Sequence, residues 1–443
     1  MAVIFTALFA HSQVTIKGKV VNTAGVPLPN AGVNLSINLK SPLFTFTNDS
    51  GYFQFTRVLA VHNQGSLQVN YVGKRAYNNM ISTNTDQDLI IILQDEAFFL
   101  DPLEIKAVRA SDKSPFTKTN IGAEQITKNN LGQDIPYLLN QTPSVYVSSD
   151  AGNGVGYTYM HIRGTDATRI NVTLNGIPYN DAESEGTYFV DLPDILSSTN
   201  SIQVQRGVGT STNGAGAFGA TINLSTNEFR DTAYAESNNS YGSFNTWKNT
   251  VRIGSGLINN HFTVDTRLSQ ISSDGYIDRA SSNLQALYLS GAYINKKTSI
   301  RFNFITGKEK TYQAWYGIDS LTLKTDRTFN PAGTEKTGTP YNNQTDNYWQ
   351  THYQLFFNQV LSGTWNLNVA TFLTRGYGYY EEYKAQQAFA DYGLPDAVID
   401  NTTVTATDLV RQRWLDNYFY GQTFSLQYKK LKDEITLGGS WTT

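Results

Sequence analysis

The chain has 443 residues, a formal net charge of -3 and no cysteine, and charged residues make up only 16% of it. This balance, without a clustered basic face, argues against a nucleic-acid partner, and the lack of cysteine excludes disulfide and thiolate chemistry. The 27 Tyr and 35 Gly, against three Met, indicate extended structure with many turns, in a chain long enough for more than one core.

The first twelve residues are predicted to be the remnant of a secretory signal peptide. Residues 1–10 are apolar, and Ala10-His11-Ser12 before Gln13 fits a cleavage site between small residues, although the usual basic start is missing. The alternative is a buried N-terminal strand. A transmembrane helix needs about eighteen consecutive apolar residues, and the sequence contains no such run.

Residues 13–95 are predicted to form a small β-sandwich, because short runs of alternating apolar and polar residues are separated by turn residues. The last of these strands would be Leu89–Leu93. The segment resembles the carboxypeptidase-regulatory-like module in three motifs, namely Gly18-x-Val20, Pro27-x-Pro29-x-Ala31-x-Val33 and Thr47-x-x-x-Gly51-x-Phe53. This resemblance implies no peptidase activity, because the module carries no metal ligands.

Residues 96–119 are predicted to be a linker that contains one short alternating strand. Apolar and charged residues alternate after Pro102, in the order Leu103, Glu104, Ile105, Lys106 and Ala107. An unpaired strand of this kind can be added to the sheet of another protein, with main-chain hydrogen bonds supplying the affinity. The alternative is an ordinary connection between domains.

Residues 120–228 are predicted to form a small α+β unit. Asp134 and Pro136 begin a short helix, with proline in the first turn, where a helix tolerates it. The Asn175-Gly176 dipeptide between apolar residues is a strong hairpin signal, since both turn positions need positive φ. A further alternating strand ends at Arg206-Gly207, before a loop rich in glycine.

The order of four motifs in this unit resembles the plug domain of TonB-dependent outer-membrane receptors. Each motif is weak alone, but four in the right order over about sixty residues are specific. They are Ile162-Arg163-Gly164, Asn175-Gly176-Ile177-Pro178, Ile202-x-Val204-x-Arg206-Gly207 and Gly216-Ala217-Phe218-Gly219-Ala220-Thr221-Ile222-Asn223-Leu224. The arrangement with an N-terminal regulatory-like module resembles that of Bacteroidota receptors.

This resemblance implies three kinds of site. The segment Leu103–Ala107 would be the TonB box, captured by a TonB-type protein that works with ExbB and ExbD. Arg163 and Arg206 would form buried ion pairs with barrel glutamates and anchor the plug, because a buried guanidinium needs such partners; the alternative is a pair of surface charges. Three loops, 148–159, 179–188 and 208–214, would face the ligand, with candidate contacts at Asn153, Tyr157, Tyr179, Asp181, Glu183 and Tyr188.

Residues 229–443 show long two-residue alternation, with about nine predicted strands. Ile300, Phe302 and Phe304 alternate with polar residues, for example. Short turns such as 295–297 and 361–363 are expected on one side, and long polar loops, 309–349 and 376–413, on the other. One apolar and one polar face per strand suit an outer-membrane barrel with a wet lumen. A soluble sandwich or propeller is the alternative, with more uniform connections.

The predicted strand number is odd, whereas single-chain outer-membrane barrels have even numbers and the resemblance implies twenty-two strands. The segment is therefore expected to be the first part of a barrel, seen as an open sheet around or beside the plug. Trp315 and Tyr316 lie in its first long loop. They are predicted either to stack on a ligand or to belong to the aromatic girdle at the membrane interface.

The residue inventory argues against an enzyme. The five histidines are scattered without metal-ligand spacing, and His161 is expected to be a structural strand residue. The loop 207–219 lacks the Lys-Ser/Thr step of a phosphate loop, and no nucleophile elbow or EF-hand is present. No catalytic residue, cofactor or metal site is predicted.

The predicted fold is mainly β, with an N-terminal sandwich, an α+β plug and part of a transmembrane antiparallel barrel. The predicted function is TonB-dependent import of a scarce solute through the outer membrane of a Gram-negative bacterium, with the N-terminal module in the periplasm. An iron chelate is favoured as cargo, and cobalamin or a glycan is possible. The expected partners are TonB, outer-membrane lipid and a small-molecule or metal-chelate ligand. A signalling or adhesion receptor without import, and a passive porin, are the alternatives.

Overall fold

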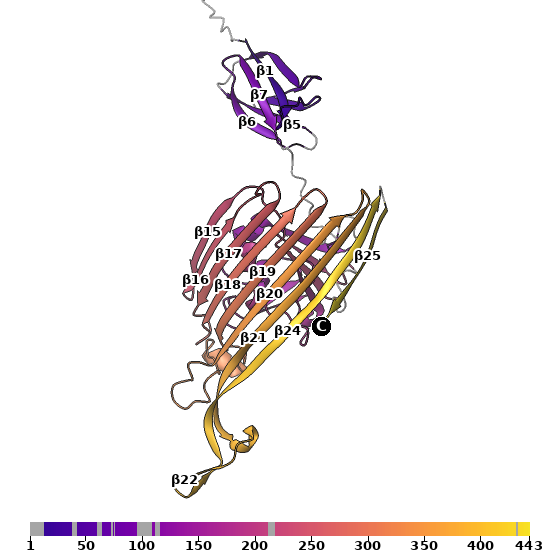
Figure 1. Ribbon diagram of the computed structural model, residues 1–443. Coiled ribbons are helices and arrows are strands. Elements are labelled where there is room, and N and C mark those ends of the chain that lie inside the picture. Colours follow the sequence, from indigo (N-terminus) through magenta and orange to yellow (C-terminus); the bar gives the residue numbers. More distant parts are fainter. Residues whose placement is uncertain are drawn as a thin grey trace, which may run out of the picture. The chain divides into compact units, whose positions relative to one another are not determined.

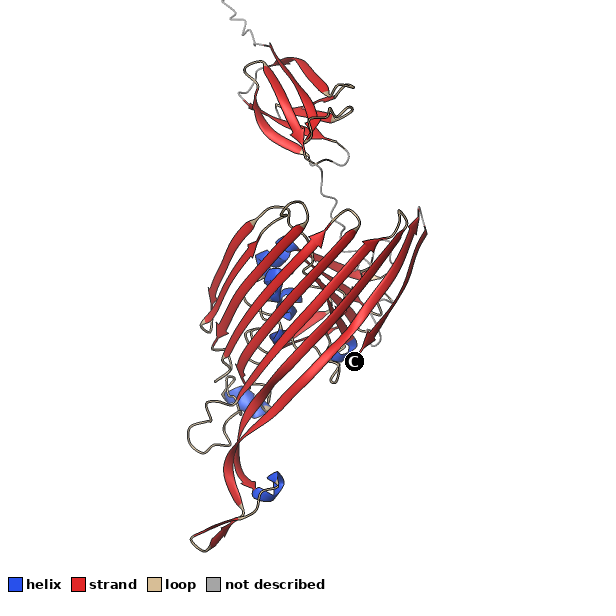
Figure 2. Cartoon of the chain, viewed as in Figure 1, coloured by secondary structure: helices blue, strands red, loops and turns tan. Residues whose placement is uncertain are grey.

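The computed structural model describes residues 13–37, 42–59, 64–71, 74, 76–94, 109–110, 116–210, 218–430 and 433–443. The chain divides into two compact units, residues 1–99 and 100–443 (Figures 1 and 2). The predicted signal remnant, residues 1–12, and the alternating segment Leu103–Ala107 both lie outside the described ranges. No helix within these ranges is long and apolar enough to cross a membrane.

The first unit is a β-sandwich of two sheets. One sheet has the order β4-β1-β7 and the other β3-β2-β5-β6, and apolar side chains such as Ile16, Leu35 and Leu67 fill the core between them. The predicted sandwich is therefore confirmed. Its strands are β1 (Gln13–Asn22), β2 (Gly32–Ser36), β3 (Leu43–Phe46), β4 (Tyr52–Leu59), β5 (Gln64–Asn70), β6 (Tyr77–Ser82) and β7 (Gln87–Leu93).

The second unit begins with the α+β plug. Its main sheet has the order β12-β11-β14-β13-β8, and β9 and β10 form a separate antiparallel pair. The strands are β8 (Thr117–Gly122), β9 (Val145–Ser149), β10 (Thr158–Ile162), β11 (Ile170–Leu174), β12 (Ile177–Pro178), β13 (Ser201–Arg206) and β14 (Ala220–Ser225). The helical segments are α2 (Ala123–Asn129), α3 (Ile135–Leu139), η1 (Ala167–Arg169), η2 (Phe189–Asp191) and η3 (Ile195–Ser198).

Two local predictions for the plug can be compared with its backbone. Asn175 and Gly176 have φ of 58° and 83°, so the predicted Asn-Gly hairpin turn is confirmed. Asp134 stands at the N-cap position of α3, but its side chain makes no hydrogen bond to the helix. Its carboxylate instead accepts a hydrogen bond from the Thr158 hydroxyl at 3.0 Å, which ties α3 to β10.

The rest of the unit is one antiparallel sheet of nine strands paired in chain order, which confirms the predicted number. Ile300 and Phe302 are exposed while the alternating residues Arg301 and Asn303 are buried, so the sheet turns apolar side chains outward and polar ones inward. The strands are β15 (Tyr234–Gly242), β16 (Thr246–Gly254), β17 (Phe262–Ser273), β18 (Ser282–Ile294), β19 (Thr298–Tyr312), β20 (Thr345–Val360), β21 (Trp365–Ala388), β24 (Ala406–Lys430) and β25 (Asp433–Thr442).

The strands extend further into the predicted long loops than the sequence pattern suggested. The loops reduce to residues 313–344, which contain α4 (Ser320–Thr325), and 389–405, which contain η5 (Phe389–Tyr392) and the hairpin β22 (Ala397–Ile399) and β23 (Thr402–Val404). At these strand ends polar and aromatic residues occupy both faces, so the alternation fades while the main-chain ladder continues. In Figure 1, β21 and β24 run beyond their neighbours and carry this hairpin.

The plug packs against the inner face of the sheet (Figure 2). Its main core includes Tyr288 from β18 and Ile305 from β19. Two smaller apolar clusters add to this contact: Val155 and Val190 of the plug pack on β17 and β18, and Ile177 packs on β20 and β21. The position of the plug on the sheet is therefore fixed by three separate buried contacts.

Candidate functional site

A buried carboxylate of the plug is held by cations of the sheet. Asp194, between η2 and η3, forms an ion pair with Lys248 of β16 at 2.9 Å, and the two side chains are only 0% and 2% exposed. Arg267 of β17 donates hydrogen bonds to the main-chain carbonyls of Asp194 and, at 3.3 Å, of Pro193. Residues of both strands thus bind the same turn of the plug.

Neutral donors complete the surroundings of this carboxylate. Oδ1 accepts a hydrogen bond from Ser197 at 2.6 Å, and Oδ2 accepts from Thr250 at 2.6 Å and Ser269 at 2.7 Å. Burial alone raises the pKa of Asp194, but the nearby Lys248 and Arg267 oppose it and bring the pKa to about 2. The carboxylate is therefore ionised at neutral pH.

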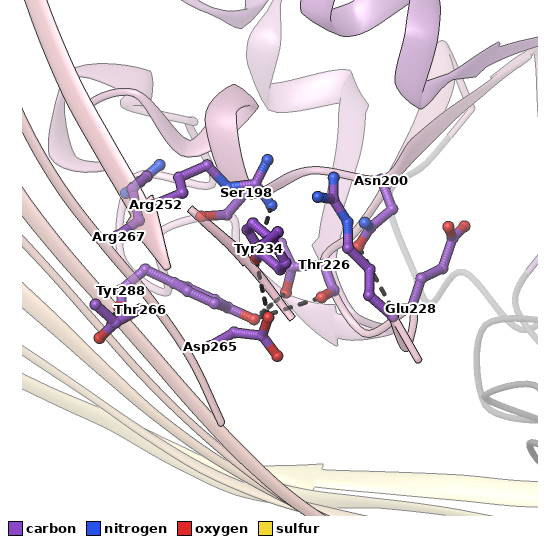
Figure 3. Close-up of a pocket in the computed structure, with 11 residues that line it drawn as sticks. Ser198, Asn200, Thr226, Glu228, Tyr234, Arg252, Asp265, Thr266, Arg267 and Tyr288 are labelled. Carbon is purple, nitrogen blue, oxygen red and sulfur yellow. Dashed lines mark hydrogen bonds between the residues drawn. The ribbon is translucent and has the colours of Figure 1, made fainter. Parts of the chain in front are cut away.

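A polar cavity lies beside this ion pair, where the plug meets the first strands of the sheet (Figure 3). Arg267 contributes to its wall. The Tyr234 hydroxyl donates to Asp265 at 2.9 Å, and the Tyr288 hydroxyl lies 3.3 Å from the Thr226 hydroxyl. Plug and sheet therefore meet here through hydrogen-bonding groups as well as through apolar packing.

The hairpin turn of the plug makes a second polar contact with the sheet. The Asn175 amide is fully buried and donates to Gln354 of β20 at 3.0 Å and to Thr226 at 2.9 Å. The Thr226 backbone N–H donates in return to Asn175 Oδ1 at 2.7 Å. The turn that the sequence revealed is thus also a docking point.

Arg163 and Arg206 make no ion pair with a barrel glutamate in the part of the chain that is described. Arg163 is exposed, with a left-handed backbone at φ 54°. Arg206 donates within the plug, to Thr119 and to the Pro143 carbonyl, both at 3.3 Å. Their pairing with glutamates stays a prediction. The ion pair that anchors the plug, Asp194 with Lys248, was not predicted from the sequence. In this pair the carboxylate belongs to the plug and the cation to the sheet.

Four of the eight predicted ligand contacts meet in one aromatic cluster. The ring centroid of Trp315 lies 5.5 Å from that of Tyr157, 6.2 Å from Tyr316 and 6.3 Å from Tyr380 of β21. Tyr157 also contacts Tyr188, with centroids 6.5 Å apart. The contact with a plug tyrosine favours the ligand side over the membrane girdle as the place of Trp315.

The other four predicted contacts have mostly structural partners. The Asn153 amide donates to Ser273 of β17 at 2.7 Å, and the Tyr179 hydroxyl donates to the Tyr188 carbonyl at 2.6 Å. Asp181 accepts from the Ser184 N–H at 2.7 Å within its own turn, and Glu183 in that turn is exposed. A role for these residues in binding stays a prediction.

Three buried carboxylates lie under the aromatic cluster and were not singled out from the sequence. The Tyr157 hydroxyl donates to Asp346 at 2.6 Å and lies 3.3 Å from Glu309, while Asp191 accepts from Gln350 at 3.4 Å. Burial, and then the charges of Asp346 and Asp181, raise the pKa of Asp191 well above its usual range. The inward positions of Glu309 and Asp346 on the alternating strands β19 and β20 were a signal for these two, whereas Asp191 lies in η2 and had no such signal.

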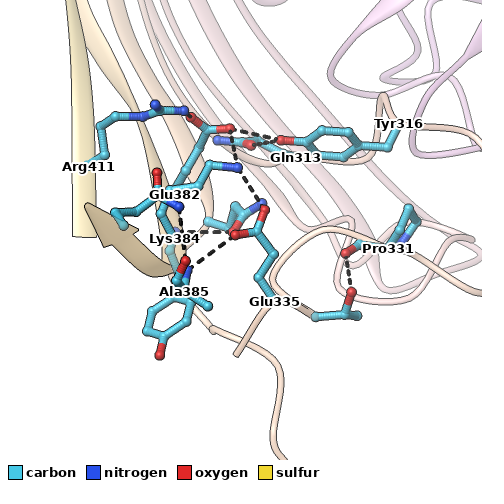
Figure 4. Close-up of polar contacts among 12 residues, drawn as sticks. Gln313, Tyr316, Pro331, Glu335, Glu382, Lys384, Ala385 and Arg411 are labelled. Carbon is cyan, nitrogen blue, oxygen red and sulfur yellow. Dashed lines mark hydrogen bonds and ion pairs between the residues drawn. The ribbon is translucent and has the colours of Figure 1, made fainter. Parts of the chain in front are cut away.

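Charged residues fasten the long loop to the end of β21 (Figure 4). Glu382 pairs with Arg411 of β24 at 2.7 Å and accepts from the Tyr316 hydroxyl at 3.2 Å. Lys384 pairs with Glu335 of the loop at 2.7 Å. The loop that bears Trp315 is thus tied down at both of its sides.

Comparison with known proteins identifies the plug. Residues 110–221 match the family model described as TonB-dependent Receptor Plug Domain. A comparison with curated protein sequences found no match. This match confirms the resemblance to a plug domain that the four sequence motifs indicated.

Several solved receptors share the fold. The closed form of Fiu, the ferric-catecholate import receptor of E. coli K12, is 15% identical, with a TM-score of 0.54 over 78% of this chain and 49% of its own. FecA, a ferric citrate transporter, is 16% identical, with a TM-score of 0.54 over 74% and 47%. BauA, the ferric preacinetobactin receptor of Acinetobacter baumannii, is 15% identical, with a TM-score of 0.54 over 74% and 46%. The chain spans about half the length of these receptors.

Proposed function

We propose that this chain, which carries the plug domain and nine barrel-type strands of a TonB-dependent receptor, serves in the active import of a scarce solute across the outer membrane of a Gram-negative bacterium. The observation that supports this best is the plug itself, seated on the inner face of the sheet by apolar clusters and by the Asp194–Lys248 pair. A passive pore would need no such domain. Import changes no covalent bond of the solute.

The energy for moving the plug would come from TonB, working with ExbB and ExbD, through the segment Leu103–Ala107. Residues just after this segment are tied to central plug strands. Arg109 donates to the Ser201 carbonyl of β13 at 3.1 Å and to the Asn223 carbonyl of β14 at 3.0 Å. A pull on the segment would therefore act on the middle of the plug sheet, and external work would make the conformational change directional.

The cargo we favour is an iron chelate, because solved receptors with this fold include a ferric-catecholate import receptor and a ferric citrate transporter. Cobalamin or a glycan stays possible as cargo. The ligand would meet the cluster of Tyr157, Trp315 and Tyr188, whose rings join plug and barrel loop. The N-terminal sandwich would lie in the periplasm.

The test is to delete Leu103–Ala107 in the full-length receptor and to measure ligand binding and ligand uptake separately. We expect binding to be kept and uptake to be lost. A matched control exchanges the two charges, Glu104→Lys with Lys106→Glu, and keeps the apolar alternation on which strand addition depends; it should retain uptake. If the deletion variant imports ligand at the normal rate, energised import by this segment is refuted.

A further inference from the structure

A cleft opens between the plug and the barrel loops next to the aromatic cluster. It measures about 220 Å³ and is bordered by Ser149 and Asp150 of the plug, by Ile277, and by loop residues that include Trp315 and Phe329. Asp150 is the only charged residue among those that line it. A complete ligand pocket usually has 300–1,000 Å³, so this cleft suits one group of a larger molecule.

The walls of the cleft are held in place by hydrogen bonds across the plug–barrel boundary and between barrel loops. The Ala151 carbonyl accepts from the Tyr276 N–H at 2.8 Å and from the Ile277 N–H at 3.3 Å. On the other side the buried Asn330 amide donates to the Asp278 carbonyl at 2.9 Å. A site formed before its ligand arrives loses less conformational entropy on binding.

The carboxylate at the edge of the cleft keeps acceptor capacity for a ligand. Asp150 accepts a hydrogen bond from the Tyr159 hydroxyl at 3.0 Å, and it forms no ion pair with any lysine or arginine in the described ranges. Arg279 lies close to the loop, but it donates to the carbonyls of Asn330 and Ala332 and does not line the cleft. An ionised carboxylate can accept about four hydrogen bonds.

Three further acidic side chains lie next to the cleft. Asp191, Glu309 and Asp346 are buried below Tyr157, and within the described part of the chain none of the three pairs with a basic side chain. Trp315, which borders the cleft, contacts Tyr157 directly. Aromatic faces attract cations through the ring quadrupole, and the Asp150 carboxylate at the edge of the cleft adds to that attraction in a partly desolvated site.

We infer that this cleft is a subsite for an organic cation, an ammonium or guanidinium group on an apolar or aromatic arm of the cargo. The inference rests on the proposed import function, since it specifies which part of an imported molecule the mouth receives. The cationic group sits between Asp150 and the ring of Trp315, and its apolar arm lies along Ile277 and Phe329. An anionic group of the same size is repelled.

The test uses three small aromatic probes of similar size and different charge: benzylammonium, benzyl alcohol and benzoate. Binding to the purified full-length receptor is followed by tryptophan fluorescence and by ligand NMR. We expect benzylammonium to bind at least tenfold more tightly than benzoate. In Asp150→Asn, the advantage of benzylammonium over benzyl alcohol should fall to about twofold or less.

Asp274→Asn is the matched control, because Asp274 is exposed on the same side of the barrel, is absent from the cleft lining, and loses the same charge. It should bind all probes as the unchanged receptor does. Equal binding of benzoate and benzylammonium, or an unchanged preference in Asp150→Asn, would overturn the cation subsite. A charge preference that disappears equally in Asp274→Asn would also overturn it. If the probes show the expected charge preference but deletion of Leu103–Ala107 leaves uptake normal, the import proposal fails and the subsite stands. If the deletion abolishes uptake but the probes show no charge preference, the subsite fails and the import proposal stands.

Discussion

Replacement of Asp194 by asparagine should loosen the plug from the sheet. The change keeps the shape of the side chain but removes the charge that faces Lys248 and Arg267, both of which lie in buried positions. The pKa of Asp194 falls from 3.8 to about 2 in the folded protein, which corresponds to about 2.5 kcal/mol of stabilisation at neutral pH. Removing one partner of a buried pair usually costs about 3–5 kcal/mol, because the other charge stays buried without its partner. We expect a loss of about 3 kcal/mol.

The assay is urea unfolding of the plug, reported by a fluorophore on a cysteine introduced into the otherwise cysteine-free chain. With a urea dependence of about 1–3 kcal/mol/M, a loss of about 3 kcal/mol lowers the midpoint by about 1–3 M. Asp166→Asn is the control, since Asp166 is an exposed plug residue that accepts from the Thr168 N–H in its own turn. Its midpoint should hardly change.

The pH dependence offers an independent check of the same ion pair. Because the folded pKa of Asp194 is lower than its unfolded value, its stabilisation is complete above about pH 4 and is lost as the pH falls toward about 2. Asp194→Asn should therefore lack this acid-dependent part. If Asp194→Asn and Asp166→Asn shift the midpoint equally, the ion pair does not hold the plug.

Three further predictions concern other buried contacts of the plug. A Cβ at Gly307 would lie 2.5 Å from the Asp191 carbonyl and 2.5 Å from Pro193, so Gly307→Ala should cost about 1–3 kcal/mol of plug stability in the urea assay, whereas Gly291→Ala, with open space in the same sheet, should cost much less. Asn175→Ala removes the hydrogen bonds of the buried amide to Thr226 and Gln354, at a residue with left-handed backbone. We expect it to cost about 2–3 kcal/mol of plug stability. A cost smaller than that of Gly291→Ala would contradict the docking role of the turn. Burial raises the pKa of Asp134 from 3.8 to about 7, so plug stability should decrease as the pH rises from about 4 to about 7. Asp134→Asn should remove that decrease in the same urea unfolding curves.

The sequence contained enough information for the architecture, because strand periodicity is local. Ile300 and Phe302 against Arg301 and Asn303 already distinguish the outer from the inner face, and the structure buries the polar pair as an outward-apolar sheet requires. The Asn175-Gly176 turn is also a local signal, because the positive φ angles of its two residues favour this residue pair. Strand ends were harder to predict, because main-chain pairing of β21 and β24 continues beyond the apolar band.

The anchor of the plug could not be predicted, because it joins residues far apart in the chain. Thr250 and Arg267 are 56 and 73 positions from Asp194. Many inward polar residues on neighbouring strands look alike in sequence, and only the docked position of the plug selects Lys248. The aromatic cluster could be predicted only in part. The tyrosines in the loops suggested ligand contact, but the contact of Tyr157 with Trp315 depends on how the plug docks on the sheet.

The most direct test of plug movement during import is to lock the plug reversibly. The side chains of Asn175 and Gln354 meet at 3.0 Å, so cysteines at both positions of the full-length receptor can be joined by a short, reducible crosslinker. We predict that the locked receptor binds ligand but imports none, and that a reductant restores uptake. Undiminished uptake with the crosslink complete would contradict the proposal that the solute passes only when the plug moves.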